Sequence, residues 1–125
     1  INLDYGHGTG HGVGFFSNVH EGPQSISKFN SIELKEGMIV SNEPGYYEEG
    51  KFGIRIENLV YIEKVKNNLI FKNLTMAPID KDLINEKLLT SIEKKYLFNY
   101  NMEIYRNISK FLTKNEKKWV LNSII

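Results

Sequence analysis

The chain has 125 residues, of which 41% are hydrophobic, and its 16 basic and 15 acidic residues give a formal net charge of +1. This length and composition suit one small domain with its own core. The balanced charge gives no field that would favour nucleic acid or a membrane surface as a partner. The absence of cysteine excludes disulfides and thiolate ligands and favours a reducing compartment.

The start of the chain gives no sign of a leader or anchor. No apolar run is long enough to span a bilayer, and no basic segment followed by an apolar run marks a signal peptide. The first residue is Ile1, and a histidine-containing motif follows within a few residues. We therefore expect the sequence to be a piece of a longer chain.

Residues 5–16 read YGHGTGHGVGFF, with glycine at every even position from 6 to 14. The spacing does not match the dinucleotide-binding pattern GxGxxG, and glycines at roughly 1 kcal/mol each oppose a helix. An extended segment is predicted, with its glycine face close against another backbone or a ligand and His7 and His11 on the opposite face. The α-carbons of these two histidines would then lie about 13 Å apart. The side chains could therefore serve one site but not bind one metal ion side by side. His20, in NVHEGP, would by itself be an exposed turn histidine, and here it is a candidate third histidine for that site.

Two strands are predicted on either side of a turn around Gly50. The first covers residues 38–43 and ends at Pro44, and the residue before a proline is held extended, which places Glu43 at the strand end. From residue 54 to residue 62 apolar and polar residues alternate, which predicts one strand with Arg55 and Glu57 on its less apolar face. A turn at residues 67–68 leads into a further short strand.

Glu43, Glu57 and His11 are the candidate metal ligands. A solvated strand face with an ion pair to Arg55 would explain Glu57 alone. One imidazole and two carboxylates on adjacent strand segments are, however, the donors that Mn²⁺, Co²⁺ or Zn²⁺ accept. A site for two ions needs further carboxylates, and the three aspartates, at positions 4, 80 and 82, are not natural ligands. We therefore expect any remaining ligands on chain outside this sequence.

The last third is predicted to be helical. Thr90 and Glu93 form a capping-box pattern, and apolar residues follow at a spacing close to 3.6 from Ile92 to Leu112. The pattern of Thr113 and Glu116 repeats the cap before a shorter helix. We predict a division between residues 1–79, which carry the candidate ligands, and residues 80–125, a helical extension of the same domain.

Four ordered motifs, HGTGHGVG, NVHEGP, NEPGYYE and GIRIEN, closely resemble the catalytic domain of aminopeptidase P (Xaa-Pro aminopeptidase), in particular its cytosolic eukaryotic type. The tail, with LTMAPIDKDLI and a capped helix containing LFNY, is similar to the C-terminal extension of that family. The resemblance covers essentially the whole chain. It implies an α+β fold: the C-terminal half of a pita-bread fold, with a curved, mainly antiparallel sheet and C-terminal helices.

The resemblance also implies a mechanism. Family members use two divalent ions, for which Mn²⁺ is expected and Zn²⁺ or Co²⁺ are alternatives, and a metal-bridging hydroxide attacks the Xaa-Pro bond. His11, Glu43 and Glu57 match metal ligands, and two aspartate ligands and a further substrate-site histidine lie upstream of this chain. The residue matching Glu43 also acts as general base.

The remaining site residues are carried over in the same way. His7 and His20 match residues with catalytic and substrate-binding roles, and His20 is the better candidate to stabilise the oxyanion. Tyr47 and Arg55 match substrate-site positions. The implied partners are peptides with proline at the second position, the upstream half of the catalytic domain, and a second copy of the protein in a homodimer. The implied location is the cytoplasm.

Several alternatives stay open. Prolidase and methionine aminopeptidase share the fold, and some relatives with lost metal ligands act as peptide- or protein-binding modules. Retention of His11, Glu43 and Glu57 together argues against a binding module, and HGTGHGVG and NVHEGP favour aminopeptidase P. By itself the piece should be inactive, because it supplies only three of five expected ligands.

Overall fold

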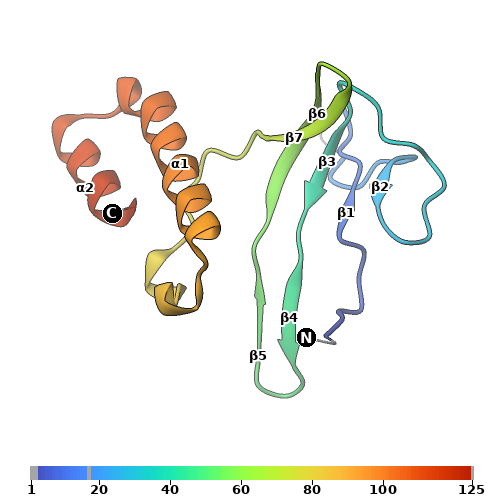
Figure 1. Cartoon of the computed structure of the whole chain (residues 1–125), viewed down its shortest axis with the longest axis horizontal. Helices are drawn as coiled ribbons and strands as arrows, with labels where there is room; N and C mark the ends of the chain where they lie inside the picture. The colour runs from blue at the N-terminus through green and yellow to red at the C-terminus, as the bar shows by residue number, and fades with distance from the viewer. Residues whose placement is uncertain (1–2, 17, 125) are drawn as a thin grey trace. The chain divides into compact units, whose positions relative to one another are not determined.

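The computed structural model of the chain describes residues 3–16 and 18–124. The chain divides into two compact units between Thr75 and Met76. The first unit carries the strands and the second the helices (Figure 1). The predicted domain division at 79/80 lies four residues further along and stays a prediction.

The strands of the first unit pair antiparallel throughout the described residues. Their bounds are β1 Gly10–His11, β2 Ser25–Ile26, β3 Ile39–Asn42, β4 Gly45–Glu48, β5 Phe52–Arg55, β6 Asn58–Val65 and β7 Asn68–Asn73. β6 lies between β3 and β7, β1 pairs with β2, and β4 pairs with β5. A bridge between Gly12 and Val40 connects the end of β1 to β3, and Val40, Val60 and Ile62 form the buried centre of this unit.

β3–β4 and β5–β6 form one two-stranded ribbon with a single interruption. Asn42 pairs with Asn58 before the interruption and Gly45 with Arg55 after it, which is the same register. Figure 1 shows β4 continuing the line of β3, and β6 that of β5. The sequence predicted one strand over residues 54–62, which is wrong, because pairing stops at Ile56 and Glu57. The physical reason lies on the facing strand, where Pro44 has no N–H to donate to the ladder.

The glycine-rich segment is less extended than predicted. Only Gly10–His11 forms a strand, and the backbone bends at Gly6, His7 and Thr9. A Cβ on Gly10 would overlap the Ser41 carbonyl oxygen, whereas Gly6 has nothing within 4 Å of the corresponding position. The predicted close approach to neighbouring backbone therefore holds at the strand end of the segment and fails at its start.

The second unit contains two α-helices within the described residues, α1 Ser91–Ile108 and α2 Lys114–Ile124. Short 3₁₀ turns cover Lys81–Leu83, Glu86–Leu88 and Ser109–Phe111. The predicted capping box is present, since the Thr90 hydroxyl accepts from the Glu93 N–H while the Glu93 carboxylate accepts from the Thr90 N–H. α1 ends at Ile108 rather than near Leu112, because Leu112 is extended before the second cap at Thr113.

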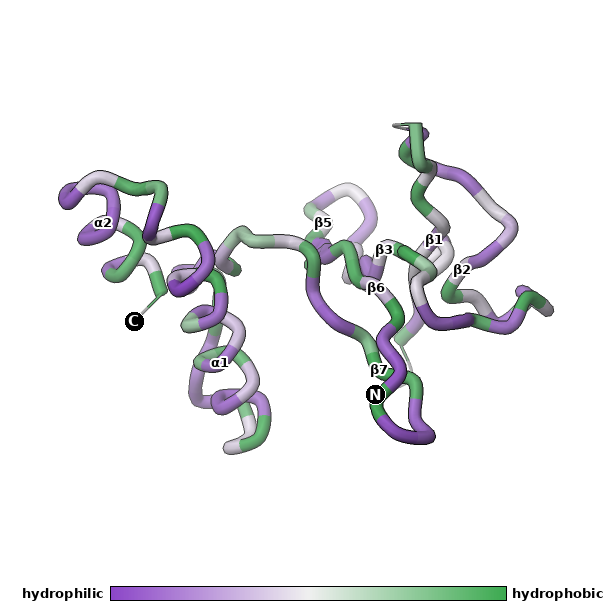
Figure 2. The backbone as a smooth tube through the Cα atoms, turned by 90° about the horizontal axis from the view of Figure 1, so that it is seen from above, coloured by the Kyte–Doolittle hydropathy of each residue, from purple (hydrophilic) through white to green (hydrophobic). Residues whose placement is uncertain are grey.

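Side chains from both helices form the core of this unit: Tyr100, Ile104, Val120 and Ile124. Figure 2 shows apolar residues in short stretches, broken by polar ones, along both units. Among the described residues, no helix combines the length and apolar character that crossing a membrane requires.

Candidate metal centre

The interruption in the ribbon sets two carboxylates opposite each other. The common register places Glu43 across from Glu57. The Ile56 N–H donates to the Pro44 carbonyl at 3.3 Å. Residues 44 and 56 are therefore a hydrogen-bonded pair of the antiparallel ladder that lacks its second bond, because Pro44 has no N–H. The adjacent Glu43 and Glu57 then occupy a non-hydrogen-bonded position, where facing side chains come closest. Like charges at such a position destabilise a sheet unless a cation lies between them.

His11 completes the cluster from β1. Its N–H donates to the Ser41 hydroxyl at 2.9 Å, which ties β1 to the end of β3. Its Nδ1 lies 3.0 Å from the Gly12 carbonyl oxygen. Because a carbonyl only accepts, Nδ1 carries the proton. His11 Nε2 then faces Glu43 Oε1 at 3.1 Å, so two lone pairs meet unless a proton or a metal ion lies between them.

The three side chains fit a divalent cation. One ligand atom from each of His11, Glu43 and Glu57 lies within 4.8 Å of the others. A histidine that donates its second N–H to a backbone carbonyl is the usual arrangement of a metal ligand. One nitrogen and two carboxylate oxygens suit Mn²⁺, Co²⁺ or Zn²⁺. Glu43 is buried and Glu57 is exposed, so the site is supported on one side and open on the other.

Glu43 is held by residues on the same face of the ribbon. The Ser41 hydroxyl donates to Oε1 at 2.9 Å, and Arg55 Nη1 donates to Oε2 at 3.0 Å. Ser41 is fully buried and was missed by the sequence analysis. Its signal was available, because a serine two residues before Glu43 in an apolar strand shares the face of that glutamate.

Arg55 connects this centre to Tyr47 and His7. Its Nε donates to the Tyr47 hydroxyl at 3.0 Å, and that hydroxyl lies 2.6 Å from His7 Nε2. The hydrogen bond to Tyr47 and the carboxylates of Glu43 and Glu57 raise the pKa of Arg55 above its usual range. Arg55 therefore stays cationic beside the two glutamates.

The third histidine lies at the same place. The rings of His20 and His11 have centroids 4.1 Å apart. A hollow of about 280 Å³ is lined by His7, Gly8, Gly10, His11, His20, Glu43 and Arg55. The structure thus brings the three predicted histidines, both glutamates, Tyr47 and Arg55 into one connected group.

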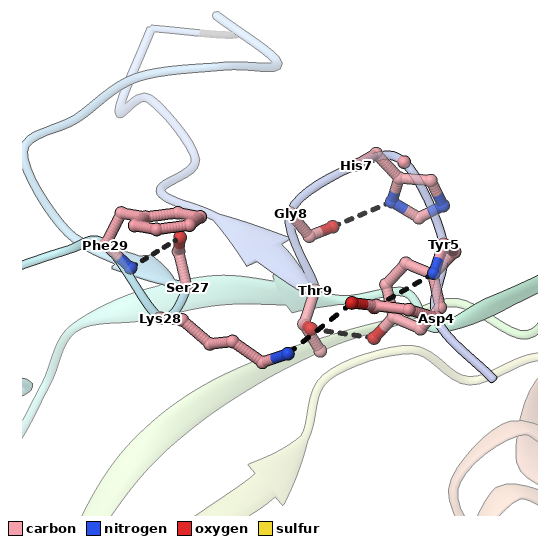
Figure 3. Close-up of a pocket in the computed structure, with 9 residues that line it drawn as sticks. Asp4, Tyr5, His7, Gly8, Thr9, Ser27, Lys28 and Phe29 are labelled. Atoms are coloured by element: carbon pink, nitrogen blue, oxygen red, sulfur yellow. Dashed lines mark hydrogen bonds and ion pairs between the residues drawn. The ribbon is translucent and has the colours of Figure 1, made fainter. Parts of the chain in front are cut away.

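A second hollow, of about 410 Å³, adjoins the first at His7 and Gly8. Residues 4–9 and 27–29 line it. Figure 3 shows Tyr5 hydrogen-bonded to Thr9 on one side of the hollow, and Phe29 hydrogen-bonded to Ser27 on the other side. At its rim Lys28 Nζ lies 3.5 Å from an Asp4 carboxylate oxygen. Asp4 is thereby engaged in this surface ion pair.

The sequence matches two known regions that together cover nearly all of it. Residues 2–64 match metallopeptidase family M24, and residues 67–124 match the C-terminal region of peptidase M24. The probable Xaa-Pro aminopeptidase P of Coprinopsis cinerea is 52% identical over 93% of this chain and 20% of that protein. An uncharacterised peptidase of Schizosaccharomyces pombe is 49% identical over 94% of this chain and 22% of that protein. The chain therefore spans about a fifth of the length of these curated relatives.

A solved structure shows the same fold. The X-prolyl aminopeptidase of Caenorhabditis elegans, described as a cytosolic enzyme with a di-nuclear active site, matches with a TM-score of 0.89 and 35% identity. The match covers 99% of this chain and 22% of that protein. It confirms the predicted fold class, α+β and the C-terminal part of a pita-bread fold, and the resemblance to aminopeptidase P. The chain belongs to metallopeptidase family M24.

Proposed function

We propose that the protein to which this chain belongs is a metal-dependent Xaa-Pro aminopeptidase, which removes the N-terminal residue from peptides with proline at the second position. The observation that carries the proposal is that one ligand atom from each of His11, Glu43 and Glu57 lies within 4.8 Å of the others. Relatives named probable Xaa-Pro aminopeptidase P, at 52% and 48% identity, support the substrate class.

His11, Glu43 and Glu57 would hold two divalent ions together with carboxylates from chain upstream of this sequence. Mn²⁺ is our choice, with Zn²⁺ and Co²⁺ as alternatives, because two of the three donors are carboxylates. When bound, such ions make hydroxide available near neutral pH and polarise the scissile carbonyl. The di-nuclear site described for the Caenorhabditis elegans enzyme supports the number of ions.

The side chains around the ligands have distinct tasks in this proposal. Glu43 accepts the proton of the attacking water as general base, and Ser41 and Arg55 fix its two oxygens. His20 donates a hydrogen bond to the oxyanion that develops on the carbonyl. His7, Tyr47 and Arg55 line the part of the site that binds the peptide.

We also propose that the protein acts in the cytoplasm as a homodimer. The description of the Caenorhabditis elegans relative as cytosolic supports the location, and the dimer follows from the family resemblance. Light scattering of the purified protein after size exclusion would give its mass in solution. A monomeric mass would remove the dimer from the proposal and leave the chemistry intact.

Assays of the full-length protein, depleted of metal and then titrated with Mn²⁺, Zn²⁺ or Co²⁺, test the activity. Three substrates separate the alternatives: a tripeptide such as Arg-Pro-Pro, an Xaa-Pro dipeptide and a Met-Ala peptide. We expect metal-dependent release of the first residue from the tripeptide. Cleavage restricted to the dipeptide would indicate a prolidase, and cleavage only after methionine would indicate a methionine aminopeptidase.

A protein that binds these peptides without cleaving them under any of the three metals would instead be a binding module. That outcome would contradict the proposed activity. Absence of both upstream aspartates from the full-length sequence would contradict it in the same way, because among residues 3–16 and 18–124 three side chains contribute donor groups to the cluster.

A further inference from the structure

Both ring nitrogens of His7 are committed to hydrogen bonds. Nδ1 lies 2.8 Å from the Gly8 carbonyl oxygen, and this bond is drawn in Figure 3. Because a carbonyl oxygen can only accept, Nδ1 must carry a proton. The remaining question is whether Nε2 donates or accepts.

Tyr47 answers that question through its other contact. Arg55 Nε can only donate, and it donates to the Tyr47 hydroxyl at 3.0 Å. The hydroxyl has a single proton, and His7 Nε2 lies 2.6 Å away. If Nε2 were also protonated, an imidazolium and a guanidinium would both donate to one oxygen, with two like charges side by side. This arrangement is avoided when the ring carries its proton on Nδ1 and Nε2 accepts from the Tyr47 hydroxyl.

His11 provides an internal comparison. It uses the same local pattern, with Nδ1 donating to the carbonyl of the following glycine, Gly12, at 3.0 Å. Its Nε2, however, faces the Glu43 carboxylate at 3.1 Å, which has no proton to give when it is ionised. The same local pattern therefore gives two different imidazoles. The Nε2 lone pair of His11 is directed at the ligand cluster, whereas the Nε2 lone pair of His7 accepts the hydrogen bond from Tyr47.

The position of His7 indicates the role of an imidazole whose two ring nitrogens both take part in hydrogen bonds within the protein. Its ring packs against the Tyr5 ring, with centroids 4.7 Å apart, and meets the edge of the Tyr47 ring, with centroids 5.5 Å apart. His7 lines both the hollow at the metal centre and the adjoining hollow of Figure 3. His7 therefore lies where the two hollows adjoin.

We propose that His7 is a positioning residue, held by Tyr47 as the tautomer with its proton on Nδ1, and that it shapes the peptide-binding wall rather than donating a proton or hydrogen bond to the reacting carbonyl. The part of this proposal that concerns peptides rests on the proposed function. His20 is then the histidine that can act as donor, since neither of its ring nitrogens is engaged in a hydrogen bond within the described residues.

Kinetics of the full-length, Mn²⁺-loaded protein test the role. The variants are Tyr47→Phe, which removes the donated proton, His7→Asn, which keeps a donor for Gly8, and the double variant. Loss of one hydrogen bond predicts a KM roughly threefold to tenfold higher, with kcat nearly unchanged because only uniform binding is lost. The double variant should be no worse than the worse single variant, since both remove the same interaction.

Tyr46→Phe is the matched control. The Tyr46 hydroxyl donates to Glu48 on the exposed hairpin and has no part in the His7 contacts, so this variant should behave as wild type. A lower kcat at unchanged KM in His7→Asn would overturn the proposal, because an interaction made only in the transition state would have been lost. Additive effects in the double variant would overturn it as well. Metal content, measured in each variant, confirms that the ligand cluster is intact.

Nitrogen NMR of the full-length protein, labelled with ¹⁵N-histidine, tests the tautomer without any substrate. His7 resonances are assigned by their loss in His7→Asn. We expect a proton on Nδ1 and none on Nε2, and a changed pattern in Tyr47→Phe but not in Tyr46→Phe. A proton on Nε2 in the wild type would refute the tautomer. Failure to cleave Xaa-Pro peptides would refute only the proposed function, because this readout does not depend on turnover.

Discussion

Replacing Glu57 by glutamine should have opposite effects with and without metal. Glu57 and Glu43 face each other across the ribbon, and the ligand atoms of the cluster lie within 4.8 Å of one another. At that separation two unit charges repel by about 0.9 kcal/mol in water and about 3.5 kcal/mol at an effective dielectric constant of about 20. Because Glu57 is exposed and Arg55 offsets part of the charge, the lower figure applies.

Without metal, Glu57→Gln should therefore stabilise the protein by up to about 1 kcal/mol. With Mn²⁺ the variant should lose a ligand, bind less metal and lose most of its activity. The metal-induced rise in melting temperature should shrink accordingly, because stabilisation by a ligand follows its affinity for the folded state.

Thermal melts in chelator and in a Mn²⁺ series, together with elemental analysis, measure both effects. Glu49→Gln is the control, since it removes the same charge from the exposed turn of the β4–β5 hairpin. A melting temperature that falls equally in chelator and in Mn²⁺ would show that Glu57 has a structural role only. Unchanged metal content with normal turnover would remove Glu57 from the site.

Two further substitutions test the fold around the site and the helical unit. Gly10→Ala should cost about 1–3 kcal/mol of unfolding free energy, because its Cβ would overlap the Ser41 carbonyl, whereas Gly8→Ala, with its nearest neighbour at 3.9 Å, should be tolerated; urea denaturation compares them. Thr90→Ala should cost about 1 kcal/mol at neutral pH through loss of the cap. Hydrogen bonds from the Thr90 backbone N–H and hydroxyl lower the pKa of Glu93 below its ordinary value of 4.5, so the stabilisation from these two bonds is present above pH 4.5 and is lost as the pH falls through the lowered pKa. The backbone bond remains in Thr90→Ala, so only the share of the penalty that comes from the hydroxyl-to-carboxylate bond should disappear in acid. A penalty fully independent of pH would contradict that one bond, since the bond from the Glu93 N–H to the Thr90 hydroxyl does not titrate.

Much of the site could be predicted because its ligands lie next to recognisable backbone signals. Pro44 predicted a strand end at Glu43, one residue beyond the observed end of β3 at Asn42, and the alternation around Arg55 predicted the face of Glu57. The relative placement of the glutamates was also available in principle. A three-residue loop centred on Gly50 pairs Glu48 with Phe52, and counting back from that pair sets residue 43 opposite residue 57.

Other features could not be predicted from periodicity. The alternation of apolar residues continues through Ile56, so the strand break there is invisible without its partner strand. Whether a glycine faces open space or backbone depends on tertiary neighbours, which is why Gly6 and Gly10 differ. The proton positions on His7 and His11 follow from which groups they contact in space, and a sequence does not give those contacts.

Pro44 explains why the ligand cluster occurs at this point of the ribbon. An uninterrupted ladder would pair residue 44 with residue 56 through two hydrogen bonds, and proline leaves only the one from the Ile56 N–H to the Pro44 carbonyl. The interruption falls beside the closest cross-strand position, which Glu43 and Glu57 occupy. The Glu43 N–H is instead bonded to the Thr9 carbonyl at 2.8 Å, which brings the glycine segment and His11 to the same place. One residue without an N–H therefore accounts for the gap in pairing, and the backbone bond beside it brings the third ligand to the two carboxylates.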